Sequence, residues 1–174
     1  MMVHRAALLA LLLGAILNSC DDDKPGGAAP VGEVSYSNGH PVALSTTDES
    51  ILAVENELFR LTNEHRGSIG LPALAEDPQT RNVARGQSAH MAVHDFFSHT
   101  NPEGEGPGDR LSRAGVHWRS YGENIAAGYP SAAAAFQAWL SSPGHRANIE
   151  GTGWTHVGNG YWEGRYTQVF LTRP

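Results

Sequence analysis

The stretch Thr155–Leu171, THVGNGYWEGRYTQVFL, decides the fold at the C-terminal end of the chain. Two strand-like runs, Thr155–Tyr161 and Tyr166–Leu171, flank the short connection Trp162–Arg165, which contains a glycine. Runs of this kind joined by a short glycine-containing connection predict an antiparallel hairpin. The segment Val116–Ile125 also has an extended pattern. We therefore expect a small antiparallel sheet.

Four segments before the hairpin have the pattern of helices. In the first, Asp48 is an N-cap candidate, apolar residues recur at three- and four-residue spacing from Ile51 to about Arg66, and Gly67 ends the pattern. The other predicted helices begin at Asp77-Pro78, Asp109 and Ser131 and end near residues 97, 115 and 142, the last before Pro143-Gly144. Helices that precede and surround a small antiparallel sheet define an α+β fold.

Composition excludes several chemistries. The chain has 174 residues, a mass of 18.6 kDa and a net charge of −6, which suits one domain with an appendage and argues against a nucleic-acid partner. Lys24 and Cys20 are its sole lysine and cysteine. The predicted domain therefore has no lysine for a Schiff base, no thiol nucleophile, no cysteine zinc cluster and no internal disulfide. Histidines, carboxylates and hydroxyls remain for chemistry.

The N-terminus has the features of an export signal. A cationic start precedes the apolar run Ala6–Leu17, which is too short to span a bilayer. The run ends in Leu17-Asn18-Ser19-Cys20, which resembles a bacterial lipobox. We predict a signal peptide over 1–19, a lipidated Cys20 with a flexible tether over 20–47, and one domain over 48–174. The chain would then be an envelope lipoprotein that meets the membrane through its anchor only; a secreted protein with an incidental cysteine is the alternative.

The run HMAVHDFFSH superficially resembles a zinc-protease motif. His90 and His94 are four residues apart, so they share a helix face, and His99 follows. Met91 stands where such a motif needs its glutamate base, and the glycine turn before a third ligand is absent. We interpret His90 and His94 as part of an exposed polar helix face.

A second group of candidates lies at the edges of predicted elements. His99, Glu123 and His145 come from the segments FFSH, GENI and SPGHRANI, each beside a loop or a helix end. Histidine and carboxylate side chains that meet at such places hold a divalent cation or share protons. The three residues are far apart in the sequence, so spacing alone does not establish that they meet.

Five motifs in order resemble the bacterial branch of the CAP superfamily, named after cysteine-rich secretory proteins, antigen five and pathogenesis-related-one proteins. They are LTNEHRGSIGLPAL, FFSHTNPEGEGPGDRL, YGENIAAG, WLSSPGHRANIEG and YTQVF, and the resemblance extends from about Glu49 to Phe170. The resemblance implies an α/β/α sandwich with an antiparallel sheet between helices. It also implies a central cleft, which two histidines and two glutamates line in better-studied members and where a divalent metal such as zinc binds.

Two members of that tetrad have counterparts here. His99 matches the first histidine and Glu123 matches the glutamate of GEN. The second glutamate falls at Ser142 and the second histidine at Arg165, so half of the tetrad is missing. His145 follows Ser142 by three residues, which would let it refill the cleft. His156 is a further candidate, since many bacterial relatives have a glutamate at its position.

Two interpretations of the cleft remain open. With a water, His99, Glu123 and His145 would form a His₂Glu set that suits catalytic zinc. Alternatively the role is structural, with Glu123 bonding backbone amides and His99 bonding Glu123. Asn63, Arg66 and Asn148 are expected to be structural. Most aromatic residues of the second half should pack in the core, although Trp154, Tyr161 and Trp162 would suit a flat lipid-binding surface.

The sequence therefore predicts a ligand-binding protein. Its ligand would be a divalent cation, a lipid or a cell-wall component, bound at the cleft of His99, Glu123 and His145. The alternative is a metal-dependent hydrolase that acts on peptide or cell-wall material. A third possibility is a purely structural envelope protein.

Overall fold

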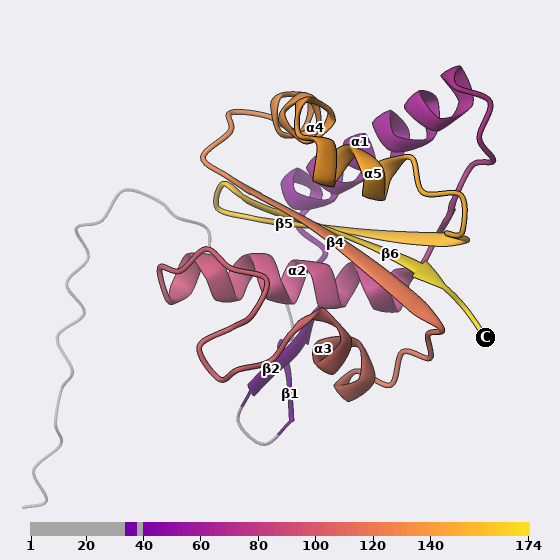
Figure 1. Cartoon of the computed structure of the whole chain (residues 1–174). Coiled ribbons are helices and arrows are strands. Elements are labelled where there is room, and N and C mark those ends of the chain that lie inside the picture. Colours follow the sequence, from indigo (N-terminus) through magenta and orange to yellow (C-terminus); the bar gives the residue numbers. More distant parts are fainter. Residues whose placement is uncertain (1–33, 38–39) are drawn as a thin grey trace, which may run out of the picture.

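The computed structural model describes residues 34–37 and 40–174. The predicted signal peptide and the lipobox with Cys20 lie outside the described residues. The remainder forms three layers, in which helices cover both faces of a sheet (Figure 1). This confirms the predicted α+β fold, an α/β/α sandwich.

The central sheet has four strands in the order β3-β5-β6-β4. Strands β4 (Ser120–Ala127), β5 (His156–Trp162) and β6 (Arg165–Thr172) are antiparallel neighbours, and the two-residue β3 (Ala75–Glu76) pairs in parallel with β5. The sheet is therefore antiparallel except at β3, and β4 forms one edge.

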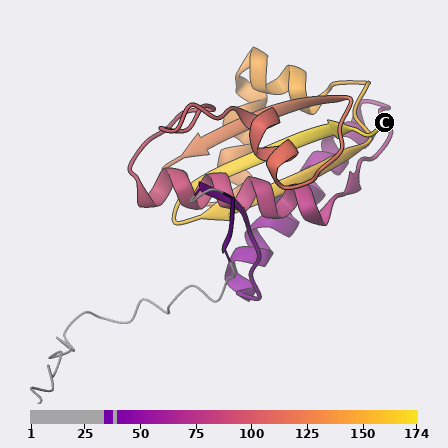
Figure 2. The same cartoon turned by 90° about the horizontal axis from the view of Figure 1, so that it is seen from below.

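Helices α1 (Glu49–Ser68), α4 (Ala132–Ser141) and α5 (Pro143–Ile149) lie on one face of the sheet. On the other face are α2 (Pro78–Val93) and α3 (Pro107–Arg113), and α2 runs along the underside of the sheet in Figure 2. Two hydrophobic clusters fill the gaps. One includes Leu58, Phe136, Trp139 and Phe170, and the other includes Val83, Leu111, Val116 and Val169.

Side-chain caps set the starts of the long helices, as the sequence predicts. Asp48 accepts a hydrogen bond from the N–H of Ser50 at 2.9 Å, and Asp77 accepts one from the N–H of Thr80 at 2.8 Å. These bonds satisfy amides that have no partner within the helix. The second helix ends at Val93, a few residues before the predicted end.

The C-terminal hairpin is confirmed, with a tighter turn than predicted. The strands β5 and β6 extend to Trp162 and Arg165, so the turn consists of two residues, Glu163 and Gly164. Both have positive φ angles, 42° and 76°. This is the backbone geometry whose twist matches that of the strands in a two-residue hairpin.

Helix α2 approaches β5 closely because two residues of β5 lack side chains. A Cβ placed on Gly158 or Gly160 would collide with the backbone of α2 at Thr80–Arg81 and Ala84–Arg85 respectively. The spacing of the two glycines by two residues keeps both on the same face of the strand. Glycine at these positions therefore sets the distance between the helix and the sheet.

The prediction of a flexible tether as far as residue 47 is wrong for its last part. A second, two-stranded sheet, β1 (Val34–Ser37) and β2 (His40–Leu44), lies beside α2. Leu44 is buried, and its carbonyl accepts a hydrogen bond of 2.6 Å from Arg85. The sequence is rich in turn residues, which concealed the strands. Their packing against α2 depends on tertiary contacts.

Two helix boundaries also differ from the prediction. The helix α3 begins at Pro107 with Gly106 as N-cap, and Asp109 accepts the Gly106 N–H at 2.9 Å. Pro143 does not end the helical region: it starts α5, at the first position, where the missing N–H costs nothing. The SPGHRANI segment is therefore largely helical. No helix in the described part of the chain is long and apolar enough to cross a bilayer.

Candidate functional site

A histidine and a glutamate from different elements meet at the edge of the sheet. His99 lies in the loop after α2 and Glu123 lies on β4, and the His99 Nδ1 to Glu123 Oε1 distance is 2.8 Å. The Glu123 side chain is only 3% exposed, whereas that of His99 is 49% exposed. The predicted meeting of these two residues is confirmed. One end of the pair is buried in the protein and the other faces solvent.

A buried arginine that no sequence pattern indicated completes this arrangement. Arg110 of α3 donates to Glu123 Oε2 at 2.7 Å, and its side chain is 2% exposed. The same guanidinium donates to the carbonyl oxygens of His99 at 2.8 Å and Glu105 at 3.0 Å. Arg110 therefore fixes both the carboxylate and the loop that presents the histidine. In the sequence it stands in the DRL of the FFSHTNPEGEGPGDRL motif.

The hydrogen bonds determine which nitrogen of His99 is available. Glu123 is paired with the Arg110 cation and acts as an ionised carboxylate, which only accepts hydrogen bonds. The Nδ1 of a neutral His99 therefore carries the proton in the bond to Glu123. The Nε2 atom then has a lone pair directed away from Glu123. This is the orientation that a carboxylate gives to a histidine acting as a proton acceptor. The group is chemically suited to accept a hydrogen bond or a proton from a ligand.

His145 lies close to this pair, on α5. Burial lowers the pKa of His145, and the nearby His99 imidazole lowers it further. His145 and Ser142 line a cavity of about 560 Å³ between α4, α5 and the edge strand β4. Most of the other lining residues are apolar: Phe97, Ile125, Ala126, Ala127, Tyr129, Ala138 and Trp139. The site is therefore a mostly apolar pocket with the His145 imidazole in its lining and the His99–Glu123 pair nearby.

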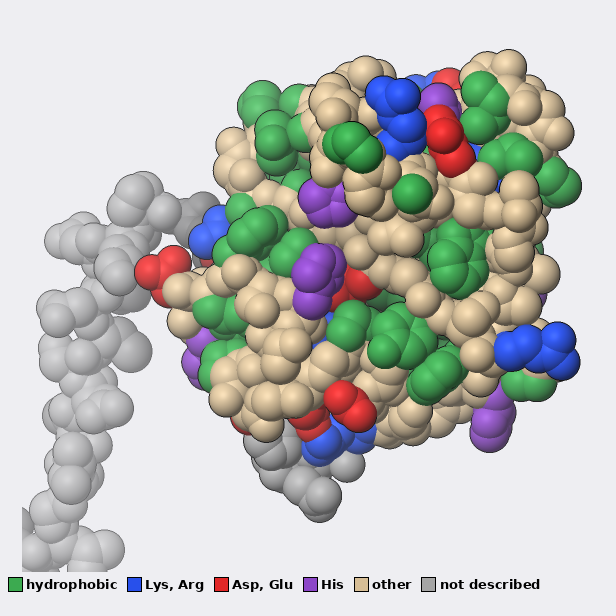
Figure 3. All heavy atoms as spheres, viewed as in Figure 1, with side chains coloured by type: hydrophobic (Ala, Val, Ile, Leu, Met, Phe, Trp, Pro, Cys, Tyr) green, Lys and Arg blue, Asp and Glu red, His purple; other side chains and the backbone are tan. Residues whose placement is uncertain are grey.

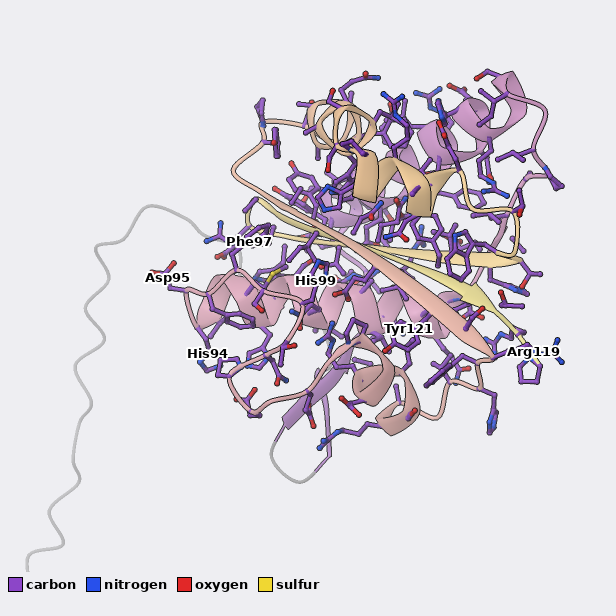
Figure 4. All side chains as sticks on the ribbon, viewed as in Figure 1. His94, Asp95, Phe97, His99, Arg119 and Tyr121 are labelled. Atoms are coloured by element: carbon purple, nitrogen blue, oxygen red, sulfur yellow. The ribbon has the colours of Figure 1, made fainter. Side chains whose placement is uncertain are left out.

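Figures 3 and 4 show this face of the molecule. In Figure 3, two histidine side chains lie one above the other near the centre, with acidic side chains in a hollow beside them and hydrophobic side chains on both sides. Figure 4 places His99 between Phe97 and Tyr121. Phe97 and Tyr121 are 54% and 38% exposed. The polar centre is thus flanked by accessible aromatic rings.

The lowered pKa of His145 gives a testable prediction. His145 is expected to titrate below the ordinary histidine value of 6.5, because burial and the field of His99 both disfavour its charged form. The unfolded chain binds this proton more readily, so stability should fall as the pH drops below 6.5. An NMR titration of the imidazole signals measures the pKa. His99→Gln should raise the pKa of His145 only in part; a midpoint at or above 6.5 in the wild type would contradict the prediction.

A metal ion fits the described residues poorly. No group of three or more His, Cys, Asp or Glu side chains in residues 34–37 and 40–174 is arranged to hold one. Glu123 already uses both oxygens, one with His99 and one with the Arg110 cation. A cation bound to Glu123 would lie beside the buried Arg110 guanidinium, whose like charge disfavours it. The zinc site stays a prediction from the resemblance, and this arrangement does not favour it.

The remaining predicted site residues divide into two groups. Ser142 lies in the pocket beside His145. His156 and Arg165 are not among the residues that line it. His156 begins β5, opposite Leu171, and its Nδ1 contacts the hydroxyl of Thr155 at 2.8 Å. Arg165 begins β6 and lies 3.7 Å from Asp95.

The helical histidine pair is not the fully exposed polar face that the sequence predicts. His90 is buried at 4% exposure, with its Nε2 at 3.6 Å from Glu103. Its ring contacts the rings of His94 and Phe96 edge to face, at centroid distances of 4.7 and 5.2 Å. His94 itself is exposed. The pair packs the end of α2 against the following loop.

The three residues predicted to be structural have that role. Asn63 exchanges two hydrogen bonds with the backbone of Leu74, at 3.0 and 2.8 Å. Arg66 donates to the carbonyls of Pro72, Ile149 and Gly151. Asn148 donates to the carbonyl of Glu123 and to Asn124. These bonds tie α1 and α5 to neighbouring segments and hold the strand that carries Glu123.

The aromatic residues of the C-terminal hairpin form no flat exposed surface. Trp162 is buried, Trp154 stacks near Phe170 with a centroid distance of 6.0 Å, and Tyr161 packs against Tyr166. These three rings therefore pack against the core instead of forming the flat surface that they would suit by sequence. The accessible aromatic rings near the cleft come instead from other segments, at Phe97, Tyr121 and Tyr129.

The fold and the cleft define the class of this protein: a three-layer domain with a histidine–glutamate pair at the edge of its sheet. The family described as "CAP: Cysteine-rich secretory protein family" matches residues 59–172. The chain therefore belongs to the CAP family of cysteine-rich secretory proteins, as the five motifs predicted.

Two curated relatives come from Bacillus subtilis (strain 168). "Uncharacterized protein YkwD" is 34% identical over 129 residues, which are 73% of this chain and 50% of YkwD. "Uncharacterized membrane protein YlbC" is 38% identical over 119 residues, which are 68% of this chain and 34% of YlbC. The chain thus matches half the length of one relative and about a third of the other.

Solved structures show the same fold. An extracellular protein containing a SCP domain from Bacillus anthracis str. Ames has a TM-score of 0.68 and 40% identity, over 75% of this chain and 45% of that one. An outer surface protein from Borrelia burgdorferi has a TM-score of 0.63 and 21% identity, over 68% of this chain and 92% of that one. At this lower identity the Borrelia protein supports the fold alone. The family is of an extracellular type.

Proposed function

We propose that the domain binds a lipid or a similar amphipathic molecule at the cleft of His99, Glu123 and His145. The apolar part of the ligand would occupy the cavity of about 560 Å³, and its polar group would face the two imidazoles. The observation that carries the proposal is the mostly apolar lining of this cavity directly beside His145. Concave, mostly apolar sites with a few polar groups are typical of small-molecule binding.

The chemistry of the polar end supports this proposal. Burial and the nearby His99 lower the pKa of His145, which favours its neutral form. A neutral imidazole costs less to desolvate than a charged one when an apolar ligand excludes water. The bond from Nδ1 to Glu123 leaves Nε2 of His99 for a carboxyl or hydroxyl group of the ligand. The two histidines would orient the ligand, and the cavity would supply most of its affinity.

Filling the pocket tests the proposal. Ala138 of α4 lines the cavity, whereas Ala133 lies on the same helix and is exposed. We expect Ala138→Phe to bind the fluorescent fatty acid cis-parinaric acid about tenfold more weakly than the wild type, since the added ring occupies the volume that the acyl chain needs. Ala133→Phe carries the same substitution outside the cavity and should bind normally. Equal binding by both variants would contradict the proposal.

We also propose that the chain is exported and attached to a membrane through lipid on Cys20. The short apolar run Ala6–Leu17 and the following Leu17-Asn18-Ser19-Cys20 support this, together with the extracellular type of the family. In a detergent phase-partition assay on the protein produced in bacteria, the wild type should enter the detergent phase and Cys20→Ser should stay in the aqueous phase. If both partition alike, the anchor is absent.

The alternative of a metal-dependent hydrolase has less support. Such an enzyme needs a cation with an open coordination position, and both oxygens of Glu123 are engaged. Hydrolysis of a peptide or cell-wall substrate that stops on addition of a chelator and in His99→Ala would favour the hydrolase over the binding protein.

A further inference from the structure

A second accessible group of aromatic rings lies on the same face as Glu123. Tyr121 and Glu123 are two residues apart on β4, so their side chains leave the strand on one face. Both meet α3, where Glu123 bonds Arg110 and the Tyr121 ring lies against Gly108. Trp118 meets the Tyr121 ring edge to face, with a centroid distance of 4.9 Å. We call Trp118 and Tyr121 the aromatic shelf.

The shelf is held in a fixed position. A Cβ on Gly108 would lie 2.7 Å from the Tyr121 ring, so the absence of a side chain at Gly108 makes room for it. The Trp118 Nε1 donates to the hydroxyl of Ser112 at 3.2 Å, and part of the indole packs on the core under α3. Rings that are already ordered lose little conformational entropy when a ligand stacks on them.

The chain segment that carries the shelf also has polar groups without hydrogen-bond partners in the described part of the chain. The Tyr121 hydroxyl, the His117 imidazole and the Arg119 guanidinium have no hydrogen-bond partner among the described residues. His117 and Trp118 also line a hollow of about 330 Å³, together with Ser112, Gly115 and Val116. Figure 4 shows Tyr121 and Arg119 near the start of β4, on the side of His99 away from Phe97. An aromatic face beside uncommitted donors and acceptors suits a ligand with both C–H faces and hydroxyl groups.

We propose that the aromatic shelf is a carbohydrate subsite. The apolar face of a pyranose ring would stack on the exposed Tyr121 ring, which the perpendicular Trp118 indole supports, and its hydroxyl groups would bond the neighbouring His117. The hollow beside Trp118, which His117 and Ser112 also line, favours a sugar over a lipid surface, since a lipid would leave these polar groups unsatisfied. From Tyr121 to Ile125 of the lipid pocket, four residues of strand cover about 13 Å. An oligosaccharide on the shelf can therefore extend toward His99, but the subsite does not depend on the pocket being filled.

An oligosaccharide titration of the full-length protein tests this subsite. The probes are the tetramers of N-acetylglucosamine and of glucose, followed through the NMR signal of the Trp118 indole N–H. We expect at least one tetramer to shift this signal, and Tyr121→Ala to weaken binding about tenfold or more. Tyr121→Phe keeps the ring and should bind within about twofold of the wild type. Trp118→Leu, which preserves apolar packing, should also weaken binding.

Tyr129→Ala serves as the matched control. Tyr129 is 39% exposed, close to the value for Tyr121, but it lines the pocket rather than the shelf. This variant should bind the sugar normally, and Tyr121→Ala should bind cis-parinaric acid normally, so failure of one site does not conceal the other. The proposal is overturned if neither tetramer shifts the Trp118 signal at about 10 mM, a concentration that detects even millimolar affinity. It is equally overturned if Tyr121→Ala binds the sugar as the wild type does.

Discussion

Replacing Arg85 by methionine is expected to lower the free energy of unfolding by about 3–5 kcal/mol, because it removes the closest cation from the buried Glu55 carboxylate, which Arg81 approaches only to 3.5 Å. Arg85 and Glu55 are almost completely buried, and the Arg85 Nε lies 2.7 Å from Glu55 Oε1. The same guanidinium donates to the carbonyl of Leu44 at 2.6 Å. The substitution therefore breaks the connection among α1, α2 and β2 in one step.

The loss should depend on pH. Burial raises the pKa of Glu55 despite the opposing effect of Arg85. The folded state then keeps this proton to a higher pH than the unfolded chain, so the contribution of Glu55 to stability falls as the pH rises above its ordinary value of 4.5. Without Arg85 the pKa rises further. Urea denaturation should show a larger loss at pH 8 than at pH 5 in Arg85→Met.

Arg60→Met is the control for this variant. Arg60 pairs with Glu57 at 2.6 Å, but both side chains are largely exposed. Exposed ion pairs are solvated and screened, so their removal changes stability little. If Arg85→Met and Arg60→Met unfold at the same urea concentration, the buried pair does not have the role that we assign to it.

Gly160→Ala is expected to reduce stability by about 3 kcal/mol or more, because overpacking forces backbone shifts. The added Cβ would collide with the backbone of α2 at Ala84 and Arg85, which cannot rotate away as a side chain would. The helix must move from the sheet, and the hydrophobic cluster that contains Val83 and Val169 must open. Thermal unfolding by circular dichroism measures the loss.

Gly67→Ala separates this packing effect from the backbone effect of glycine. Gly67 lies within α1, and a Cβ there would meet no atom within 4 Å. Alanine in an exposed helical position is expected to stabilise by about 0.5–1 kcal/mol. A wild-type melting temperature for Gly160→Ala would show that α2 does not pack as closely on β5 as the structure has it.

Two residues of the candidate site could be predicted from the sequence. His99 and Glu123 stand in short motifs beside glycine, and the structure brings them together at 2.8 Å. Arg110 was not found, because an arginine in a short helix has the pattern of a surface residue. Its burial follows from the position of α3 beneath β4, which is a tertiary property. His156 and Arg165 were predicted from the positions of functional residues in the family. The strand register places them outside the lining of the pocket.

The sequence by itself determined the elements of this protein: the capped helices, the C-terminal hairpin and the family motifs all follow from local patterns of residues. Only the tertiary structure decided how they combine. It packed β2 against α2, placed His145 beside the pocket and buried Arg110 behind Glu123. Periodicity and capping depend on neighbours within a few residues along the chain. These contacts depend instead on the distances between helices and strands, and close packing in three dimensions sets those distances.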